Sequence, residues 1–226
     1  MRRRPVIAID GPMGAGKGTV ARLLARKLGY RYVDTGAMYR AVAWRILRER
    51  IPPEDGGRVG ELARSLDVRV LPSPDDFRVW CDEEDVTEAI RSLEVNEVVG
   101  RVAAHPEVRA SLTARQRALA EEGGVVMEGR DIGTVVVPDA ELKIYLDASL
   151  EERARRRWAE FRTAGLEVPY ERVLEIVRQD DTLARNRSVS PLRRDPDARV
   201  VDTTGRSPEE VVEEIAALAR ALEGER

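Results

Sequence analysis

Short apolar, β-branched runs alternate along the chain with longer stretches in which apolar residues recur at helical spacing. The runs predict buried parallel strands at Val6–Ile9, Tyr32–Val33, Val125–Met127, Leu142–Leu146 and Arg199–Val201. The longer stretches predict helices at Thr19–Leu28, Ala37–Arg50, Ser92–Ala104, Pro106–Glu122, Leu150–Thr163, Tyr170–Asn186 and Pro208–Leu222. Because strands alternate with helices, the pattern predicts an α/β fold in which a five-stranded parallel sheet is flanked by helices.

One segment breaks this alternation. Leu66–Val86 reads as two strands of alternating polarity around a turn rich in proline, serine and aspartate. We interpret it as a hairpin inserted near residues 60–90, between the second and third strands of the sheet. Arg187–Val200 contains two prolines and many polar residues, and it predicts a loop.

The composition suits one sizeable globular domain. The chain has 226 residues, of which 42% are hydrophobic and 35% charged. No apolar run approaches the roughly 20 residues that span a bilayer, so we expect no membrane association. Cys81 is the only cysteine, which excludes a disulfide within the chain and fits the reducing cytoplasm.

The charge pattern excludes some functions and suggests another. The net charge of −3 gives no general attraction to nucleic acid. A single histidine, His105, argues against a histidine-based triad or a multi-histidine metal site. All but three of the 38 basic residues are arginine. We assign most of these arginines to the solvated surface, and expect some to bind phosphate through their planar, forked guanidinium groups.

The segment GPMGAGKGT follows the first predicted strand and precedes a predicted helix, which is the setting of a phosphate-binding loop. Its glycines allow backbone N–H groups to turn toward phosphate oxygens, and the helix N-terminus favours the same anion. Lys17 can reach the β and γ phosphates. The predicted ATP-binding residues are Gly11, Pro12, Met13, Gly14, Ala15, Gly16, Lys17, Gly18 and Thr19.

This loop departs from the pattern G-x-x-x-x-G-K-[ST] at one position. Gly18 stands where a hydroxyl residue usually binds magnesium, and Thr19 is rotated about 100° around the helix. Mg²⁺ retains several water ligands in most protein sites. We therefore predict no direct protein ligand for the metal, with Mg²⁺ held mainly by water and phosphate oxygens.

Two further motifs follow predicted strands. DTGAMYRA begins at Asp34, and EGRDIGTVVVPDAELKIYLDASLEERARRR begins at Glu128. Ligands of open α/β sheets bind outside the carboxyl ends of the strands. We therefore expect Lys17, Arg40, Arg130 and Asp131 to meet in one crevice.

Together these motifs are similar to those of bacterial-type cytidylate kinases, within the nucleoside monophosphate kinases. The resemblance runs nearly end to end, through IDGPMGAGKGT, DTGAMYR, DVTEAIRS, VAAHPEVRASLTARQR, GRDIGTVVVPDA and ARNRSVSPL. It implies Mg²⁺-assisted transfer of the γ-phosphoryl group of ATP to CMP or dCMP. It also implies one kinase unit over 1–226, with a monophosphate-binding region at about 35–122 and a lid at about 153–190.

The resemblance assigns roles to individual residues. Lys17, Arg130 and Arg187 would be catalytic, and Arg156 would contact ATP. The acceptor phosphate would be held by Arg40, Arg130 and Arg187. The cytosine edge would be read by Arg109 and Asp131, with Thr35 nearby.

Three positions depart from the family pattern. Thr35 and Gly100 each stand where a serine is familiar, and Ala184 stands where an aspartate usually holds the ribose. Asp180 and Asp181 lie shortly before Ala184 and offer carboxylates in its place.

Other interpretations of single residues stay open. Arg40 could lie on a helix surface, and Asp131 could cap the turn after its strand. The run Arg153 and Arg155–Arg157 would mostly face solvent, with one or two functional members. Cys81 reads as a packed strand residue and His105 as a helix boundary.

Two rival functions also stay open. A phosphate-loop kinase could act on another small acceptor such as UMP, AMP or shikimate. A nucleotide-binding regulatory or assembly protein could use ATP only as a switch. For the cytidylate kinase hypothesis we expect a monomer whose partners are the nucleotides ATP, CMP and dCMP.

Overall fold

The computed structural model describes residues 4–72 and 77–224. Its larger sheet contains the five predicted strands, all parallel, in the order β2-β6-β1-β7-β8. Their bounds are β1 Val6–Asp10, β2 Arg31–Asp34, β6 Val125–Gly129, β7 Leu142–Asp147 and β8 Arg199–Asp202. The predicted fold class is confirmed.

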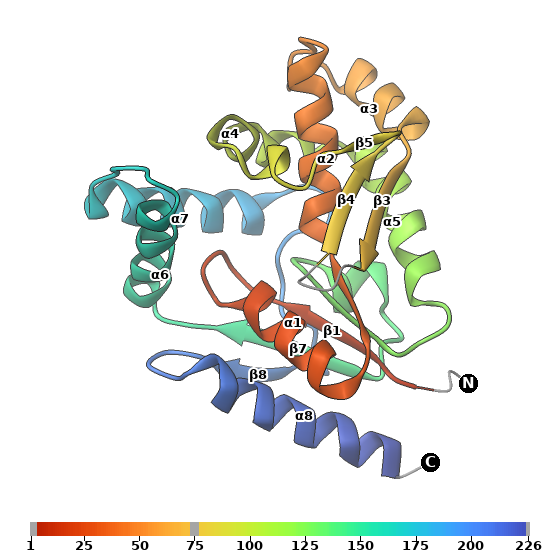
Figure 1. Ribbon diagram of the computed structural model, residues 1–226, viewed down its shortest axis with the longest axis vertical. Coiled ribbons are helices and arrows are strands. Elements are labelled where there is room, and N and C mark those ends of the chain that lie inside the picture. Colours follow the sequence, from red (N-terminus) through yellow and green to blue (C-terminus); the bar gives the residue numbers. More distant parts are fainter. Residues whose placement is uncertain (1–3, 73–76, 225–226) are drawn as a thin grey trace.

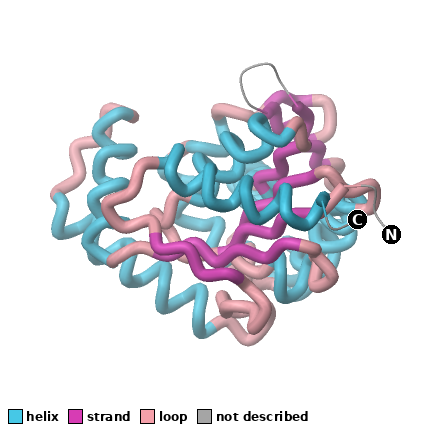
Figure 2. Tube along the Cα trace, turned by 90° about the horizontal axis from the view of Figure 1, so that it is seen from below, coloured by secondary structure: helices cyan, strands magenta, loops and turns pink. Residues whose placement is uncertain are grey.

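The central strand β1 divides its side chains between two cores. Ile7 and Ile9 pack with α1 (Lys17–Leu28) and α8 (Pro208–Gly224) on one face of the sheet. Val6 and Ala8 point to the other face, where the short helical turn η2 (Ile132–Val136) covers them. Figure 2 shows helices on both sides of the strands. This alternation is what a strand between two covered faces requires.

A second core lies between β2 and β6 in sequence. It joins α2 (Thr35–Arg48), α3 (Gly56–Ser65), α4 (Leu93–Val102) and α5 (Pro106–Ala120) to a small sheet, and it buries residues such as Ile46, Val79 and Leu112. In Figure 1 this group lies above the larger sheet, while α6 (Leu150–Thr163) and α7 (Tyr170–Asn186) project to one side. The two groups flank the carboxyl ends of the core strands.

The small sheet contains the hairpin that the alternating pattern predicts. β3 (Val68–Pro72) and β4 (Phe77–Cys81) pair antiparallel, and the tip between them lies outside the described residues. A short strand β5 (Glu84–Asp85) follows, and a 3₁₀ turn η1 (Ala89–Arg91) leads into α4.

The helices differ from the predicted ones mainly at α2 and α3. α2 begins at Thr35 because the Asp34 carboxylate accepts a hydrogen bond from the Ala37 N–H, at 2.9 Å, and so caps the helix. α3 was not predicted, since its first residues Gly56 and Gly57 disfavour a helix. Its N-terminus is stabilised by the Asp55 carboxylate, which accepts from the Arg58 N–H at 3.1 Å.

Among the residues described, none of the helices combines the length and the apolar composition needed to cross a membrane.

Candidate active site

The phosphate loop between β1 and α1 requires glycine at the positions where it turns. Gly11 has φ +154° and Gly14 has φ +76°. A Cβ at Gly11 would lie 2.1 Å from the Leu146 carbonyl oxygen, and one at Gly14 would lie 2.6 Å from the Arg153 carbonyl oxygen. Side chains are excluded at both positions, so the loop packs tightly on β7 and on α6.

Cationic side chains hold the carbonyl groups of this loop. Four successive carbonyls each accept a hydrogen bond from a lysine or arginine: Gly11 from Arg130 at 2.9 Å, Pro12 from Lys17 at 2.9 Å, Met13 from Arg153 at 3.1 Å and Gly14 from Arg156 at 3.4 Å. The carbonyls are therefore occupied, which favours a loop whose N–H groups remain for an anion.

Lys17 lies among several charged groups. Burial lowers the pKa of its ammonium, and the neighbouring Arg130 guanidinium lowers it further. Glu128, Asp180 and Asp10 oppose this effect with their negative charge. An ammonium that is charged although it is buried interacts strongly with any phosphate that enters the site.

Two carboxylates that sequence reasoning missed stand beside the loop. Asp34 and Glu128 are paired neighbours at the ends of β2 and β6. Burial raises the pKa of Glu128, and the charge of Asp34 raises it further. Each residue lies at or next to the carboxyl end of its strand, at the edge where ligands bind, but only the assembled sheet brings the two together.

Glu128 also lies next to the position that a side chain at Gly18 would occupy. A Cβ at Gly18 would lie 3.4 Å from the Glu128 Oε1 and 3.6 Å from the Tyr32 hydroxyl oxygen. Where other phosphate loops carry a hydroxyl, this chain therefore has a carboxylate nearby. Carboxylate oxygens suit a hydrated Mg²⁺ ion, so Glu128 and Asp34 are the groups able to contact its water ligands.

Arg109 and Asp131 form a buried ion pair. The Arg109 Nη2 donates to the Asp131 Oδ2, and the two residues are only 4% and 5% exposed. The guanidinium also lies over the Tyr39 ring, 5.3 Å from its centre. The Thr35 hydroxyl donates to the carbonyl of Glu128, three residues before Asp131, at 2.7 Å.

The turn after Asp131 is held by another residue. The Asp131 side chain makes no capping bond to η2 in the described structure, so the interpretation of its carboxylate as a cap is wrong. Asp10 fills this role, because its two carboxylate oxygens accept from the Ile132 and Gly133 N–H groups, each at 2.8 Å. Asp10 was missed in the sequence, where it only follows the predicted strand Val6–Ile9.

Burial of Asp10 gives the stability of the protein an unusual dependence on pH. Burial raises the pKa of its carboxyl from 3.8 to about 6. Between those values the folded protein binds more protons than the unfolded chain, so the free energy of unfolding falls as pH rises. The change is on the order of 3 kcal/mol.

Asp10→Asn should remove this dependence. We expect its unfolding free energy, measured in urea at several pH values from 4 to 7, to rise relative to wild type up to about pH 6 and then to level off. Asp55→Asn, which changes a half-buried helix cap, is the control. If the difference in unfolding free energy between Asp10→Asn and wild type stays constant with pH, the raised pKa of the Asp10 carboxyl is contradicted.

Arg40 points into the site. Its Nη2 donates to the Asp34 Oδ2 at 2.6 Å, and its side chain is 28% exposed. The alternative of a helix-surface arginine is therefore wrong. Arg130 lies between the Gly11 carbonyl and Asp180, whose carboxylate is 2.9 Å from its Nη2.

Arg187 directly follows α7 and lies near the positive charges of Arg109 and Arg130. Burial lowers the pKa of its guanidinium, followed by the charges of Arg109 and Arg130. The negative charges of Asp180 and Asp131 oppose this effect only in part, so the position of Arg187 favours a further anion.

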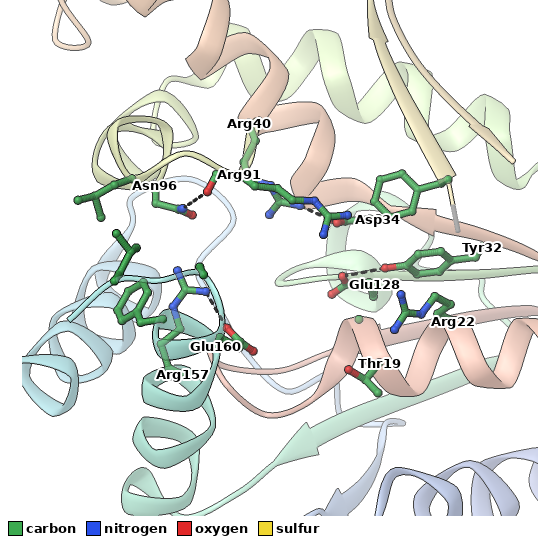
Figure 3. Close-up of a pocket in the computed structure, with 16 residues that line it drawn as sticks. Thr19, Arg22, Tyr32, Asp34, Arg40, Arg91, Asn96, Glu128, Arg157 and Glu160 are labelled. Atoms are coloured by element: carbon green, nitrogen blue, oxygen red, sulfur yellow. Dashed lines mark hydrogen bonds and ion pairs between the residues drawn. The ribbon is translucent and has the colours of Figure 1, made fainter. Parts of the chain in front are cut away.

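A cavity of about 440 Å³ opens next to the loop (Figure 3). Thr19 and Arg22 reach it from α1, Arg40 and Arg91 from α2 and η1, and Arg157 and Glu160 from α6. Of the residues predicted for the site, only Gly18, Thr19 and Arg40 line this cavity. Five other predicted residues lie outside its lining: Lys17, Arg109, Arg130, Asp131 and Arg187. Among these, Arg130 lies close enough to Lys17 and to Arg187 to lower the pKa of each, and Arg109 is paired with Asp131.

A sequence model described as "Cytidylate kinase" matches residues 7–221 of this chain. The chain belongs to the cytidylate kinase family. It is 52% identical, over 206 residues, to a cytidylate kinase of Carboxydothermus hydrogenoformans, covering 91% of this chain and 93% of that protein.

A bifunctional pantoate ligase/cytidylate kinase of Gloeobacter violaceus is 50% identical over 222 residues. That match covers 96% of this chain but only 43% of the bifunctional protein. A gluconokinase from Sinorhizobium meliloti has the same fold, with a TM-score of 0.51, 16% identity and coverage of 100% of this chain and 97% of that one.

The structure shows what surrounds two of the positions that depart from the cytidylate kinase pattern, Gly100 and Ala184. A Cβ at Gly100 would meet no atom within 4 Å, so a serine there would find open space. Ala184 is buried against Tyr145 and Leu192 and offers no group to a ligand. The nearby Asp180 and Asp181 are instead paired with Arg130 and Arg153.

The arginine run of α6 corrects one expectation. Arg155 is exposed, with 65% of its side chain accessible, but Arg153 is buried and Arg156 and Arg157 are half-buried. The prediction that this run mostly faces solvent is therefore wrong. Arg156 donates to the Thr203 hydroxyl at 2.9 Å and its carbonyl at 2.7 Å, beside the phosphate loop.

Proposed function

We propose that this protein transfers the γ-phosphoryl group of ATP to CMP, and to dCMP, giving ADP and CDP or dCDP. The observation that supports the proposal is that the phosphate loop with Lys17 lies beside Arg130, whose charge in turn acts on Arg187 near the buried pair Arg109–Asp131. These groups suit two anion sites. The phosphate loop with Lys17 supplies one site, Arg40, Arg130 and Arg187 supply the other, and Arg109–Asp131 lies next to them. The membership in the cytidylate kinase family supports the same conclusion.

The donor phosphates bind to the loop. Gly11–Thr19 offers backbone N–H groups and the positive end of α1, while Lys17 adds a charge at the β and γ phosphates. Arg156 donates to the Gly14 carbonyl and to the Thr203 carbonyl, which supports a contact between Arg156 and the donor nucleotide. These groups neutralise charge that spreads over the transferred phosphoryl group.

The acceptor phosphate binds among Arg40, Arg130 and Arg187. Planar guanidinium groups hold a phosphate in a fixed direction, which favours in-line attack. The acceptor oxygen is already anionic, so the reaction needs no separate general base. Lys17 and Arg130 touch adjacent carbonyls of the same loop, which supports a short path between the two sites.

The buried pair Arg109–Asp131 reads the cytosine edge. A carboxylate accepts from the exocyclic amino group of cytosine, and Arg109 donates to the acceptor atoms of the ring. Asp10 holds the backbone at Ile132 and Gly133, and so fixes the position of Asp131.

Mg²⁺ fits the donor set around Gly18. The ion would be held by phosphate oxygens and water, with Glu128 and Asp34 accepting from that water. When bound, it screens the negative charge of the phosphates.

The single buried cysteine and the nucleotide substrates support a cytoplasmic enzyme, which we expect to act as a monomer without nucleic acid.

The acceptor is tested by measuring ADP formation with CMP, dCMP, UMP, AMP, GMP and shikimate under identical conditions. We expect CMP and dCMP to support rates well above those of the other compounds. Equal rates with every acceptor would contradict the proposal, and a preference for UMP, AMP or shikimate would favour the rival kinase.

A further inference from the structure

Two adjacent aspartates of α7 extend to arginines on different elements. Asp181 binds Arg153 of α6 in a two-pronged ion pair, with Nη1–Oδ1 and Nη2–Oδ2 distances of 2.9 and 2.7 Å. Asp180 binds Arg130 after β6, at 2.9 Å. The role proposed above for the crevice explains Arg130, but it gives no role to Asp181 or Arg153.

Each arginine continues to the phosphate loop. Arg153 Nη1 donates to the Met13 carbonyl at 3.1 Å, and Arg130 Nη1 donates to the Gly11 carbonyl at 2.9 Å. α6 also packs directly on this part of the loop, because a Cβ at Gly14 would lie 2.9 Å from the Arg153 Cβ. Helix α7 is therefore linked to the loop at two carbonyls through two aspartates.

Arg153 is poorly placed to bind nucleotide itself. Its side chain is 5% exposed, and its Nε donates to the Ala148 carbonyl at 3.1 Å. With the bonds to Met13 and Asp181, all three of its nitrogens are engaged. Arg153 is therefore a connection between α7 and the loop.

The two links differ in what they fix. The Met13 carbonyl and the Gly14 N–H belong to one planar trans peptide and point in opposite directions. Holding this carbonyl toward Arg153 thus directs the Gly14 N–H to the other side of the chain. The Gly11 carbonyl shares its peptide with Pro12, which has no N–H, so the Arg130 link orients no donor.

We propose that Asp181 is a positioning residue for the donor nucleotide: through Arg153 and the Met13 carbonyl it orients the Gly14 N–H toward the donor phosphates. The inference rests on the proposed function, in which the loop binds ATP. Asp181 itself touches neither the loop nor the nucleotide. It controls affinity for the donor and leaves affinity for the acceptor unchanged.

The test compares binding of Mg²⁺–ADP and of CMP, each alone, by calorimetry. Asp181→Asn keeps the size of the side chain but removes the charge that holds Arg153. We expect the Kd for ADP to rise about tenfold and the Kd for CMP to stay within about twofold of wild type. Asp181→Glu keeps the carboxylate and should recover most of the ADP affinity.

Two variants of the same helix serve as controls. Glu175→Gln removes an exposed ion pair with Arg172 and should change neither Kd. Asp180→Asn removes the partner of Arg130 and should change the Kd for CMP more than that for ADP. Thermal melting establishes that each variant is folded at the assay temperature.

Three results would overturn the inference. They are an unchanged Kd for ADP in Asp181→Asn, an equal loss of ADP and CMP affinity, and a failure of Asp181→Glu to recover ADP affinity. If Asp181→Asn does not fold, Arg153→Lys replaces it, because lysine cannot bridge the Met13 carbonyl and Asp181 as the guanidinium does. A higher Kd for ADP alone then supports the inference, and an unchanged Kd for ADP overturns it. A wild-type protein that binds ADP but does not phosphorylate CMP would refute the proposed function instead.

Discussion

Lys17→Ala should slow phosphoryl transfer to CMP by about 10²-fold or more at saturating ATP and CMP. The Lys17 ammonium lies at the loop, where its Nζ is 2.9 Å from the Pro12 carbonyl oxygen. Its charge acts on the phosphoryl group as negative charge develops there, and alanine leaves this charge uncompensated. The measurement is kcat from initial rates of ADP formation.

The fold should survive this substitution. Burial lowers the pKa of Lys17, so its charge is held at a cost to stability and its removal should not lower the melting temperature. Lys27→Ala is the matched control, because Lys27 lies in the same helix but pairs with Glu213 on the surface. A folded Lys17→Ala variant with kcat near wild type would refute the role of Lys17.

Asp131→Asn should narrow the preference for CMP over UMP by on the order of 1–3 kcal/mol, or about 5- to 150-fold. Cytosine presents an amino donor to the carboxylate, whereas uracil presents a carbonyl oxygen that faces it without a proton between them. The amide of asparagine can donate to that carbonyl. The measurement is kcat/KM for CMP and for UMP, in wild type and variant.

The substitution also changes the partner of Arg109. Removing one member of a buried pair destabilises a protein, but asparagine keeps an oxygen that can accept from the guanidinium. Melting curves must therefore accompany the kinetics. Asp85→Asn breaks an exposed pair with Arg78 in the hairpin and should leave the CMP-to-UMP ratio unchanged. An unchanged ratio in Asp131→Asn would place base selection elsewhere.

The sequence was sufficient for the architecture. The runs at Val6–Ile9 and Val125–Met127 are apolar at every position, as strands covered on both faces must be, and both are buried neighbours in the sheet. The phosphate loop was readable because its glycines are a steric requirement. α3 was missed because Gly56–Gly57 obscures a helix that capping by Asp55 and burial of Val59 stabilise.

The pairing of charges could not be read from the sequence. Arg153 and Arg155 are two residues apart, yet one is buried against Asp181 and the other is exposed. Helical spacing predicts that they point in different directions, but not which direction meets α7. Asp10 and Glu128 were missed for a similar reason, since only the assembled sheet brings them to Ile132 and to Asp34.

The destination of the γ-phosphoryl group of ATP tests the central claim most directly. Wild-type protein is incubated with Mg²⁺ and ATP labelled at the γ position, with and without CMP, and the labelled products are separated. The account predicts label in CDP when CMP is present and little labelled inorganic phosphate without it. Label released as inorganic phosphate at the same rate with and without CMP would contradict it.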